Sequence, residues 1–270
     1  MQLFNGDCLE VMKSIPDKSV DMVLCDLPYG TTACKWDNVI PFEPLWECYN
    51  RIIKDNGAIV LFGIEPFTSY LICSNVKHFK QKLTWKKHKA GNFGNAKYMH
   101  LKYTEDIVLF GNGRVTYNPQ FIPRKSERVR QAQKNGNLSW NTANKTTGEL
   151  SFGTSYEPRS FKVYNADYKY PEDVIEIPAV VSTSKEKVNH PTQKPVKLLE
   201  YLIKTYTNEN EVVLDNCMGS GSTGVAAVKN HRDFIGIELD KKYFEIAKER
   251  INEAAMLNSI AYKSTVGRSD

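Results

Sequence analysis

The order of apolar and polar positions along the chain predicts alternating strands and helices. Short runs rich in β-branched and aromatic residues predict strands, whereas apolar positions that repeat every three or four residues predict helices. We predict strands at residues 20–26, 58–63, 82–88, 105–111, 212–215 and 234–239. We predict helices at residues 44–53, 66–75 and 196–205, from residue 222 onward, and from residue 241 to about 258.

This alternation is typical of an α/β domain, in which helices cover both faces of a mainly parallel sheet. In the last predicted helix, Phe244, Ala247, Ile251 and Ala254 form an apolar stripe suited to packing on a sheet. Residues 112–187 have no such period and are rich in Gly, Asn, Ser, Thr and Pro, which indicates loops and irregular strands. We therefore predict a catalytic half, an inserted region, a second half of the same domain and a polar tail, at residues 1–111, 112–187, 188–258 and 259–270.

Composition indicates a soluble globular protein, since 41% of the 270 residues are hydrophobic and 25% are charged. The longest apolar run, around residues 58–62, is much too short to cross a bilayer, and the first residues lack the layout of a signal peptide. We therefore expect a cytoplasmic protein with no membrane partner. Six cysteines without a C-x-x-C pair predict reduced thiols, and neither a metal site nor a disulfide framework.

Positive charge is concentrated in one part of the chain. Residues 75–134 contain fourteen lysines and arginines against three acidic residues, although the whole chain carries a net charge of only +5. Such segregation suits a polyanion, because each neutralised phosphate releases condensed counterions. A solvated basic surface without a partner explains the same feature.

The first candidate site follows a predicted buried strand. Residues 20–25 are almost continuously apolar, and Asp26-Leu27-Pro28-Tyr29-Gly30 comes directly after them. Ligands of open α/β sheets bind at the carboxyl ends of the strands, so an acid, a rigid proline and an aromatic ring here indicate a site. An ordinary strand-to-loop turn is the alternative.

The second candidate site is a glycine-rich turn. The predicted strand 212–215 runs into Gly219-Ser220-Gly221, and the later strand 234–238 ends at Glu238, a suitable acceptor for the hydroxyls of a ribose. This pairing is typical of nucleoside cofactors in general. Because Gly219-x-Gly221-x-x-Gly224 also matches the dinucleotide fingerprint, a dinucleotide-dependent oxidoreductase stays open at this point.

Together with Asn-His-Pro-Thr-Gln-Lys-Pro at residues 189–195, these motifs resemble the β class of DNA amino-methyltransferases. In that class an Asp-Pro-Pro-Tyr motif comes first, then the target-recognition region, then a His-Pro-Thr-Gln-Lys-Pro segment and the cofactor loop. This chain has that order, and Gly6-Asp7-Cys8 also resembles the class. The resemblance implies a circularly permuted, Rossmann-like methyltransferase fold that uses S-adenosylmethionine, with a target-recognition region inserted at 112–187.

Residue by residue, the resemblance assigns catalysis to Asp26, Leu27, Pro28 and Tyr29. It assigns Asp7 to the adenine of the cofactor, Glu238 to its ribose and Lys194 to the neighbourhood of its methionine part. The full set of cofactor residues that it implies is Asp7, Cys8, Asp26, His190, Thr192, Gln193, Lys194, Asp215, Cys217, Met218, Gly219, Ser220, Gly221, Thr223, Glu238 and Leu239. The run 103–111 resembles the strand of the class near the flipped base, and for it and for Trp85 we favour core packing.

The implied reaction is methylation of an exocyclic amino group in DNA. Asp26 would accept a hydrogen bond from that amino group, and Tyr29 would stack on a base flipped out of the duplex. Leu27 replaces the usual proline of the class, which leaves room for an altered base preference. In the class an Asp at the first motif position favours adenine, so we predict an adenine-specific enzyme, with a cytosine 4-amino methyltransferase as the alternative.

The implied partner is double-stranded DNA, which would place the enzyme at the nucleoid. The basic residues that we expect to contact DNA are Lys86, Lys87, Lys89, Arg124, Lys125, Arg128 and Arg130. A homodimer and a cognate restriction endonuclease stay open as further partners. The recognition sequence cannot be read, because base contacts depend on side chains of the irregular middle segment.

Overall fold

A computed structural model describes residues 1–30, 38–127, 131, 167–188 and 192–266. The chain forms two compact units, one made of residues 1–118 and 173–270 and a smaller one of residues 119–172. In the smaller unit, β6 (Ile122–Pro123) pairs antiparallel with β7 (Tyr168–Lys169). Among the described residues, none of the helices combines the length and the apolar character that crossing a bilayer requires.

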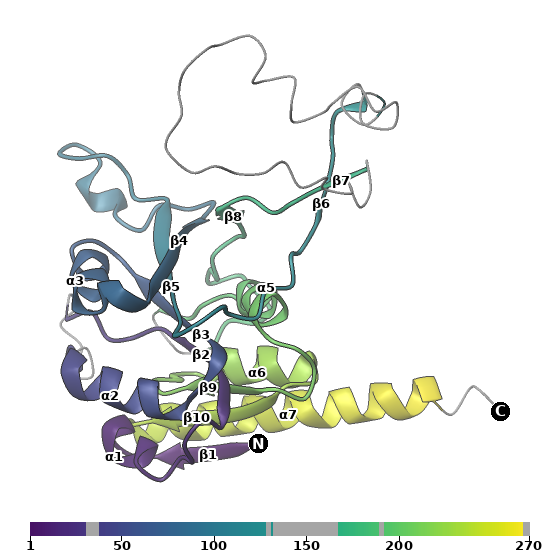
Figure 1. Cartoon of the computed structure of the whole chain (residues 1–270). Coiled ribbons are helices and arrows are strands. Elements are labelled where there is room, and N and C mark those ends of the chain that lie inside the picture. Colours follow the sequence, from purple (N-terminus) through teal and green to yellow (C-terminus); the bar gives the residue numbers. More distant parts are fainter. Residues whose placement is uncertain (31–37, 128–130, 132–166, 189–191, 267–270) are drawn as a thin grey trace, which may run out of the picture. The chain divides into compact units, whose positions relative to one another are not determined.

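The described part of the larger unit contains an eight-stranded, mostly parallel sheet, which confirms the predicted α/β class (Figure 1). Among the described strands of this sheet, β5 alone runs antiparallel to its neighbours, β3 and β4. The strand order is β1 (Gln2–Asn5), β10 (Asp233–Glu238), β9 (Val212–Asp215), β2 (Val20–Cys25), β3 (Ile53–Gly63), β5 (Thr104–Phe110), β4 (Phe79–Lys86) and β8 (Val174–Glu176).

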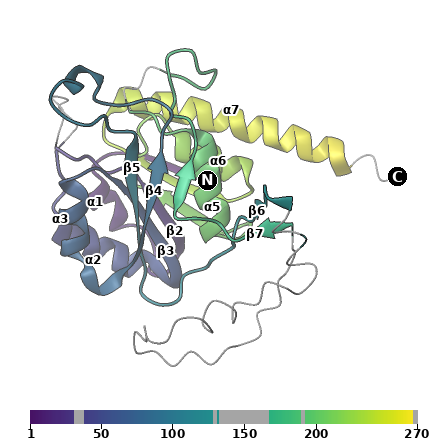
Figure 2. The same cartoon turned by 90° about the horizontal axis from the view of Figure 1, so that it is seen from above.

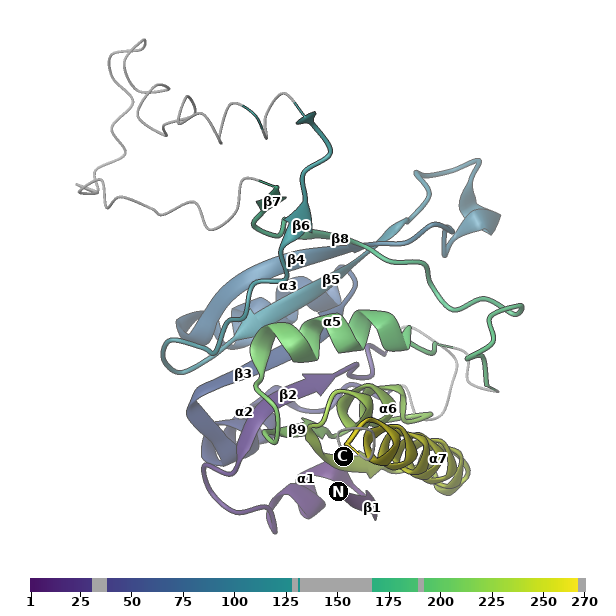
Figure 3. The same ribbon diagram turned by 90° about the vertical axis from the view of Figure 1, so that its right-hand side faces the viewer.

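Helices cover both faces of the sheet (Figures 2 and 3). One face carries α1 (Cys8–Met12), α2 (Phe42–Ile52) and α3 (Phe67–Ser74). The other carries α5 (Val196–Tyr206), α6 (Ser222–Lys229) and α7 (Lys241–Val266). Two 3₁₀ turns, Val76–His78 and Phe93–Asn95, lie on either side of β4 in the sequence.

Two hydrophobic cores follow from the alternation of side chains along the buried strands. Met22 and Leu24 of β2 pack in the core under α5, α6 and α7, whereas Val23 and Cys25 pack in the core under α1 and α2. Because both faces are covered, all six residues of β2 are buried. This explains why the strand reads as a continuous apolar run in the sequence.

The structure departs from the sequence-based elements mainly at the edges of the sheet. The predictions omit β1, α1 and β8, which are three to five residues long and carry little periodic signal. The segment after residue 173 adds β8 to β4, so the smaller unit is shorter than the predicted insertion at 112–187. At the C-terminal end, α7 continues to Val266, beyond the apolar stripe and into the predicted polar tail.

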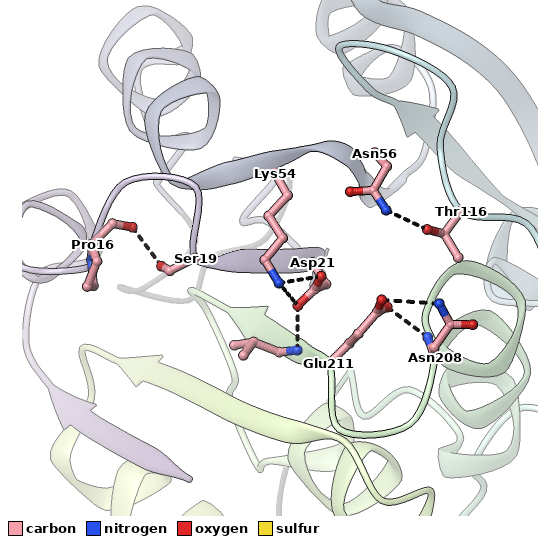
Figure 4. A network of polar contacts seen from close by, with 9 residues as sticks. Pro16, Ser19, Asp21, Lys54, Asn56, Thr116, Asn208 and Glu211 are labelled. Atoms are coloured by element: carbon pink, nitrogen blue, oxygen red, sulfur yellow. Dashed lines mark hydrogen bonds and ion pairs between the residues drawn. The ribbon is translucent and has the colours of Figure 1, made fainter.

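A buried carboxylate joins the two halves of the larger unit at the start of β9 (Figure 4). Asp21 is 5% exposed, and its oxygens accept hydrogen bonds from Nζ of Lys54 at 2.7 and 2.8 Å. The same carboxylate accepts a hydrogen bond of 2.9 Å from the main-chain N–H of Val212. Asp21 therefore fixes the point at which β9 begins to pair with β2, whose register aligns Met22 with Val213.

We expect Asp21→Ala to lower the free energy of unfolding by about 1–3 kcal/mol, because a partly buried main-chain N–H loses its acceptor. Urea denaturation followed by circular dichroism measures the change. Asp55→Ala is the matched control, since Asp55 pairs with Lys18 but its side chain is 92% exposed, and it should change stability little. Equal losses in the two variants would contradict the assigned role.

Candidate active site

Two strand ends that are distant in the sequence lie side by side and open into one cleft. β2 ends at Cys25 and delivers Asp26, while β9 ends at Asp215 and delivers the glycine turn. Because β2 and β9 are parallel neighbours, both ends lie at the same edge of the sheet. The cleft has a volume of about 900 Å³ and is lined by residues 26–29 of the first strand end and residues 215–220 of the second.

The cleft brings together most of the residues that the sequence assigns to the site. Those that line it are Asp7, Cys8, Asp26, Leu27, Pro28, Tyr29, Lys87, Lys89, Thr192, Gln193, Lys194, Asp215, Cys217, Met218, Gly219, Ser220, Thr223, Glu238 and Leu239. Lys86 and Gly221 do not line it. Arg124 and Lys125 belong to the smaller unit, and His190, Arg128 and Arg130 lie outside the described residues.

Glu238 lies at one end of the cleft, held by the glycine turn. Its Oε2 accepts a hydrogen bond from the main-chain N–H of Gly219 and its Oε1 accepts one from Asp240, both of 2.8 Å. Burial raises the pKa of Glu238 above its usual range, although these bonds oppose the shift. The carboxylate therefore has a fixed orientation, as a hydrogen-bond acceptor for a diol requires.

The turn needs glycine for two different reasons. Gly219 has a φ of 51° and Gly221 a φ of 77°, both in the left-handed region that glycine adopts without strain. A Cβ on Gly221 would also lie 2.9 Å from the backbone of Ala247 in α7. Gly221 thus permits the close packing of α7 on the start of α6, whereas Gly219 shapes the cleft.

Asp7 and Cys8 form the wall of the cleft next to Glu238. Oδ1 of Asp7 caps α1 by accepting hydrogen bonds from the main-chain N–H groups of Leu9 and Glu10. A hydrogen bond with Cys217, together with burial, raises the pKa of Cys8, so its thiol stays protonated. The described cysteines, Cys8, Cys25, Cys48, Cys73 and Cys217, are free thiols.

Asp215 lies under the turn and is 3% exposed. Burial raises the pKa of its carboxyl group to about 7, although hydrogen bonds from Thr223 and from the main-chain N–H of Cys217 act in the opposite direction. Oδ1 of Asp215 accepts the bond from Cys217 at 3.1 Å. The position of the turn therefore depends on a carboxyl group that titrates near neutral pH.

Asp26 lies toward the other end of the cleft, and both of its oxygens have partners. Oδ1 accepts a hydrogen bond from the hydroxyl of Tyr29, and Oδ2 accepts one of 2.5 Å from Nζ of Lys194. The ring of Tyr29 also packs on Phe67, with ring centroids 4.9 Å apart. Burial and the nearby Asp26 carboxylate raise the pKa of Tyr29 well above its usual value, so the phenol is a hydrogen-bond donor.

Leu27 stands where the β class of DNA amino-methyltransferases has a proline, and it is part of the hydrophobic core. It is 3% exposed and belongs to the same apolar cluster as Leu45 and Phe67. Its side chain therefore anchors the motif in the core, although Leu27 also lines the cleft together with Asp26 and Tyr29. This placement explains why an aliphatic residue is accommodated between the two polar ones.

Sequence reasoning missed the ion pairs of Lys194. Its Nζ contacts Asp26 and lies 3.5 Å from Oε2 of Glu105, a residue of β5. Oε1 of Glu105 in turn accepts a hydrogen bond of 2.8 Å from Lys87, which follows β4. A carboxylate at the start of the apolar run 105–110 was the available signal, since a charge in a buried strand requires a partner.

A family model for N6- and N4-type DNA methylases, described as DNA methylase, matches residues 20–249, which include both strand ends of the cleft. The chain belongs to the DNA methylase family. The predicted family and the predicted class of enzyme are thereby confirmed, and the oxidoreductase alternative is excluded.

Among curated proteins, this DNA methylase is similar to the DNA adenine methyltransferase YhdJ of Escherichia coli, with 29% identity over 94% of this chain and 83% of the relative. It is also similar to the type II methyltransferase M.HpaI of Haemophilus parainfluenzae, with 26% identity over 93% of this chain and 74% of the relative. A third relative is the type II methyltransferase M1.MboII of Moraxella bovis, at 27% identity over 92% of this chain and 95% of the relative.

Among solved structures, the M1.HpyAVI–SAM complex has 25% identity and a TM-score of 0.59, over 93% of this DNA methylase and 98% of that chain. The cytosine-N4-specific PvuII DNA methyltransferase has 15% identity and a TM-score of 0.60, over 95% of this chain and 91% of that one, which shows a shared fold. The prediction of S-adenosylmethionine as cofactor is confirmed at the level of the family.

The raised pKa of Asp215 makes stability depend on pH in a definite direction. The folded protein keeps a proton on Asp215 up to about pH 7, whereas the unfolded chain loses it near the ordinary value of 3.8. The contribution of Asp215 to the free energy of unfolding is therefore fully present below pH 3.8, the ordinary pKa of the group, and is lost as the pH rises through about 7. We therefore expect Asp215→Asn to gain stability relative to the wild type between these two pH values, as measured by urea denaturation; parallel pH curves would contradict this.

Proposed function

We propose that this DNA methylase transfers a methyl group from S-adenosylmethionine to the 6-amino group of an adenine flipped out of double-stranded DNA. The observation that carries the proposal is the single cleft that contains both Asp26 and the turn bound to Glu238. One end suits a nucleoside cofactor and the other suits an amino group. The two reactants can therefore meet within one cleft.

The described residues fit the cofactor at three points. Glu238 is oriented to accept hydrogen bonds from the ribose hydroxyls, Asp7 lies next to it for the adenine, and Gly219 permits close approach of the backbone. When bound, S-adenosylmethionine supplies a methyl group on a positively charged sulfur that is already activated. The chain itself has to hold the acceptor in line with that methyl group and exclude water.

Asp26 is the group that acts on the acceptor. The lone pair of an adenine amino group is delocalised into the ring, so the nitrogen is a poor nucleophile. A hydrogen bond from the amino group to Asp26, together with one to a main-chain carbonyl at Leu27 or Pro28, favours the pyramidal nitrogen. The same carboxylate stabilises the positive charge that develops on the nitrogen.

Tyr29 provides the surface on which the flipped base stacks. The target amino group cannot be reached inside a duplex, and aromatic side chains are sequence-tolerant stacking platforms. In the structure one partner of the Tyr29 ring is Phe67, and its hydroxyl is bound to Asp26. Stacking therefore requires that the base enter next to the existing aromatic pair.

Adenine is the base that the motif favours. An Asp at the first position of the tetrapeptide, as at Asp26, points to adenine, and one relative bears the name DNA adenine methyltransferase. A cytosine 4-amino methyltransferase is the second candidate, because the similar PvuII structure is cytosine-N4-specific and has the same fold. Other relatives are named type II methyltransferases, which favours a cognate restriction endonuclease as a partner of this enzyme. A DNA substrate also implies that the enzyme works at the nucleoid.

The decisive experiment incubates the protein with unmethylated DNA and methyl-labelled cofactor, and identifies the modified nucleoside by mass spectrometry. We expect 6-methyladenine.

Asp26→Ala should lower the turnover number by about 10²–10³-fold, because an acceptor for the developing charge is lost. Glu238→Gln should instead weaken cofactor binding, measured by calorimetry. Methylated cytosine would favour the second candidate, and full turnover of Asp26→Ala would refute the mechanism.

The connection between β4 and β5 is the DNA-contacting surface that the structure favours. We call residues 88–103 the lysine arm; it contains Lys89, Lys97 and Lys102 and no acidic residue. The side chains of Phe93 and Tyr98 are exposed by 76% and 85%. Exposed lysines beside exposed aromatic rings are typical of nucleic-acid surfaces, where cations contact phosphates and rings contact bases.

Of the basic residues that the sequence predicts at the DNA, only some suit this role once the lysine arm is taken as the contact surface. Lys86 pairs with Glu176 at 2.7 Å and Lys87 is largely buried against Glu105, so both already have ionic partners. Lys89 is exposed at the rim of the cleft and keeps the expected role. Arg124 and Lys125 belong to the smaller unit, which we propose as the region that reads the target sequence.

We expect the double variant Lys97→Ala, Lys102→Ala to reduce the slope of log affinity against log salt concentration by about 2, since each phosphate contact contributes about 0.9. Fluorescence anisotropy of a labelled duplex over a range of salt concentrations measures the slope. Lys13→Ala is the matched control, because Lys13 directly follows α1, outside the lysine arm, and pairs with Glu10. An unchanged slope in the double variant would remove the lysine arm from the interface.

A further inference from the structure

Lys194 blocks the catalytic acid in the structure. Both oxygens of Asp26 have hydrogen-bond partners, and the Oδ2 partner is the ammonium group of Lys194, which is itself 9% exposed. A target amino group has to take one of these acceptor positions. The positive charge that develops on its nitrogen would also be opposed by an ammonium group on the same carboxylate.

Glu105 offers Lys194 a second acceptor nearby. Oε2 of Glu105 lies 3.5 Å from Nζ of Lys194, and it is a buried oxygen without a hydrogen-bond partner in the described part of the chain. Buried polar atoms normally have a partner, so this oxygen requires an explanation. A short movement of Lys194 away from Asp26 would satisfy it.

Two neighbours hold Glu105 ready for this contact. Lys87 donates a hydrogen bond of 2.8 Å to Oε1, which leaves Oε2 directed to the side of Lys194. Burial acts to raise the pKa of Glu105, but Lys194 and Lys87 outweigh it and lower the pKa below its usual range. Glu105 is therefore an anion fixed in place, and it lines the same cleft as Asp26.

Phe62 makes the movement of the lysine less costly. Nζ of Lys194 lies 5.0 Å from the centre of the Phe62 ring, within the range of a cation–π interaction. A cation is attracted to an aromatic ring at any position within about 6 Å of its centre. A short movement of Nζ toward Glu105 can therefore keep the contact with Phe62, so that the charge stays partnered during the transfer.

We propose that Glu105 is a positioning residue that takes Lys194 over from Asp26 when the target base enters the cleft, which frees Oδ2 of Asp26 to accept the hydrogen bond of the amino group. No covalent bond changes in this step; one ammonium group exchanges one carboxylate partner for another. The proposal rests on the proposed function, because it assigns the vacated oxygen to the amino group of the target base.

Glu105→Gln tests the transfer, because a neutral amide is a poor competitor for an ammonium group bound to Asp26. We expect the single-turnover rate of methyl transfer at saturating cofactor and DNA to fall by about tenfold or more, with an unchanged Kd for S-adenosylmethionine. Glu176→Gln is the matched control: Glu176 also pairs with a lysine next to this edge of the sheet, but outside the cleft, and its rate should equal that of the wild type.

A double-mutant cycle separates this role from a merely structural one. In Lys194→Met no ammonium group occupies Asp26, so adding Glu105→Gln should slow the reaction no further. Effects that multiply would overturn the transfer, as would a wild-type rate in Glu105→Gln. If Glu105→Gln does not fold, Glu105→Asp retains the charge but withdraws the acceptor, and it should show a smaller loss of rate.

The wild-type reaction distinguishes failure of this inference from failure of the proposed function. If the wild type methylates no adenine, the proposed function fails, and the assignment of the vacated oxygen fails with it. If the wild type is active while Glu105→Gln retains its full rate and the cycle is multiplicative, only the transfer of Lys194 is refuted.

Discussion

The parallel pairing of β2 with β9 is the constraint on which the rest of the structure depends. These strands lie far apart in the sequence; β2 ends at Cys25 and leads directly into Asp26, whereas β9 ends at Asp215, at the same edge of the sheet. Asp21 fixes this pairing at the start of β9, because its carboxylate binds both Lys54 and the first main-chain N–H of β9. A shift of one residue would turn alternate side chains to the wrong core and would separate the two carboxylates. The cleft is thus a direct product of strand register.

Within the cleft, buried charge is balanced locally, and the balance differs at the two ends. Near the glycine turn, main-chain N–H groups hold Glu238, and burial raises the pKa of Asp215, which accepts a hydrogen bond from the main-chain N–H of Cys217. Near residues 26–29, Asp26 and Glu105 both pair with Lys194, and Lys194 together with Lys87 keeps Glu105 ionised. The first end is therefore suited to neutral polar groups such as hydroxyls. The second is suited to a group that becomes positively charged during the reaction.

Predictions from the sequence were most accurate where both faces of a strand or one face of a helix are buried. β2, β9 and β10 lie close to their predicted bounds, because burial on both sides requires continuous apolar runs. The short edge strands β1 and β8 escaped prediction, since partial exposure leaves no such run. Motif order likewise identified the family, and the family model matches residues 20–249, which include both strand-end motifs.

The sequence by itself determined the α/β class, the two strand-end motifs and the acidic residues that define each site. Only the tertiary structure decided that Lys194 pairs with Asp26 and Glu105, that Leu27 belongs to the core and that Lys87 is largely buried against Glu105. The reason is physical. The apolar or polar character of each position in the sequence predicts whether that residue is buried, but it does not say which other residue it contacts. The partner of a buried charge is set by the lateral order of strands, and here β2, β5 and residue 194 meet across a sheet whose order differs from that of the sequence.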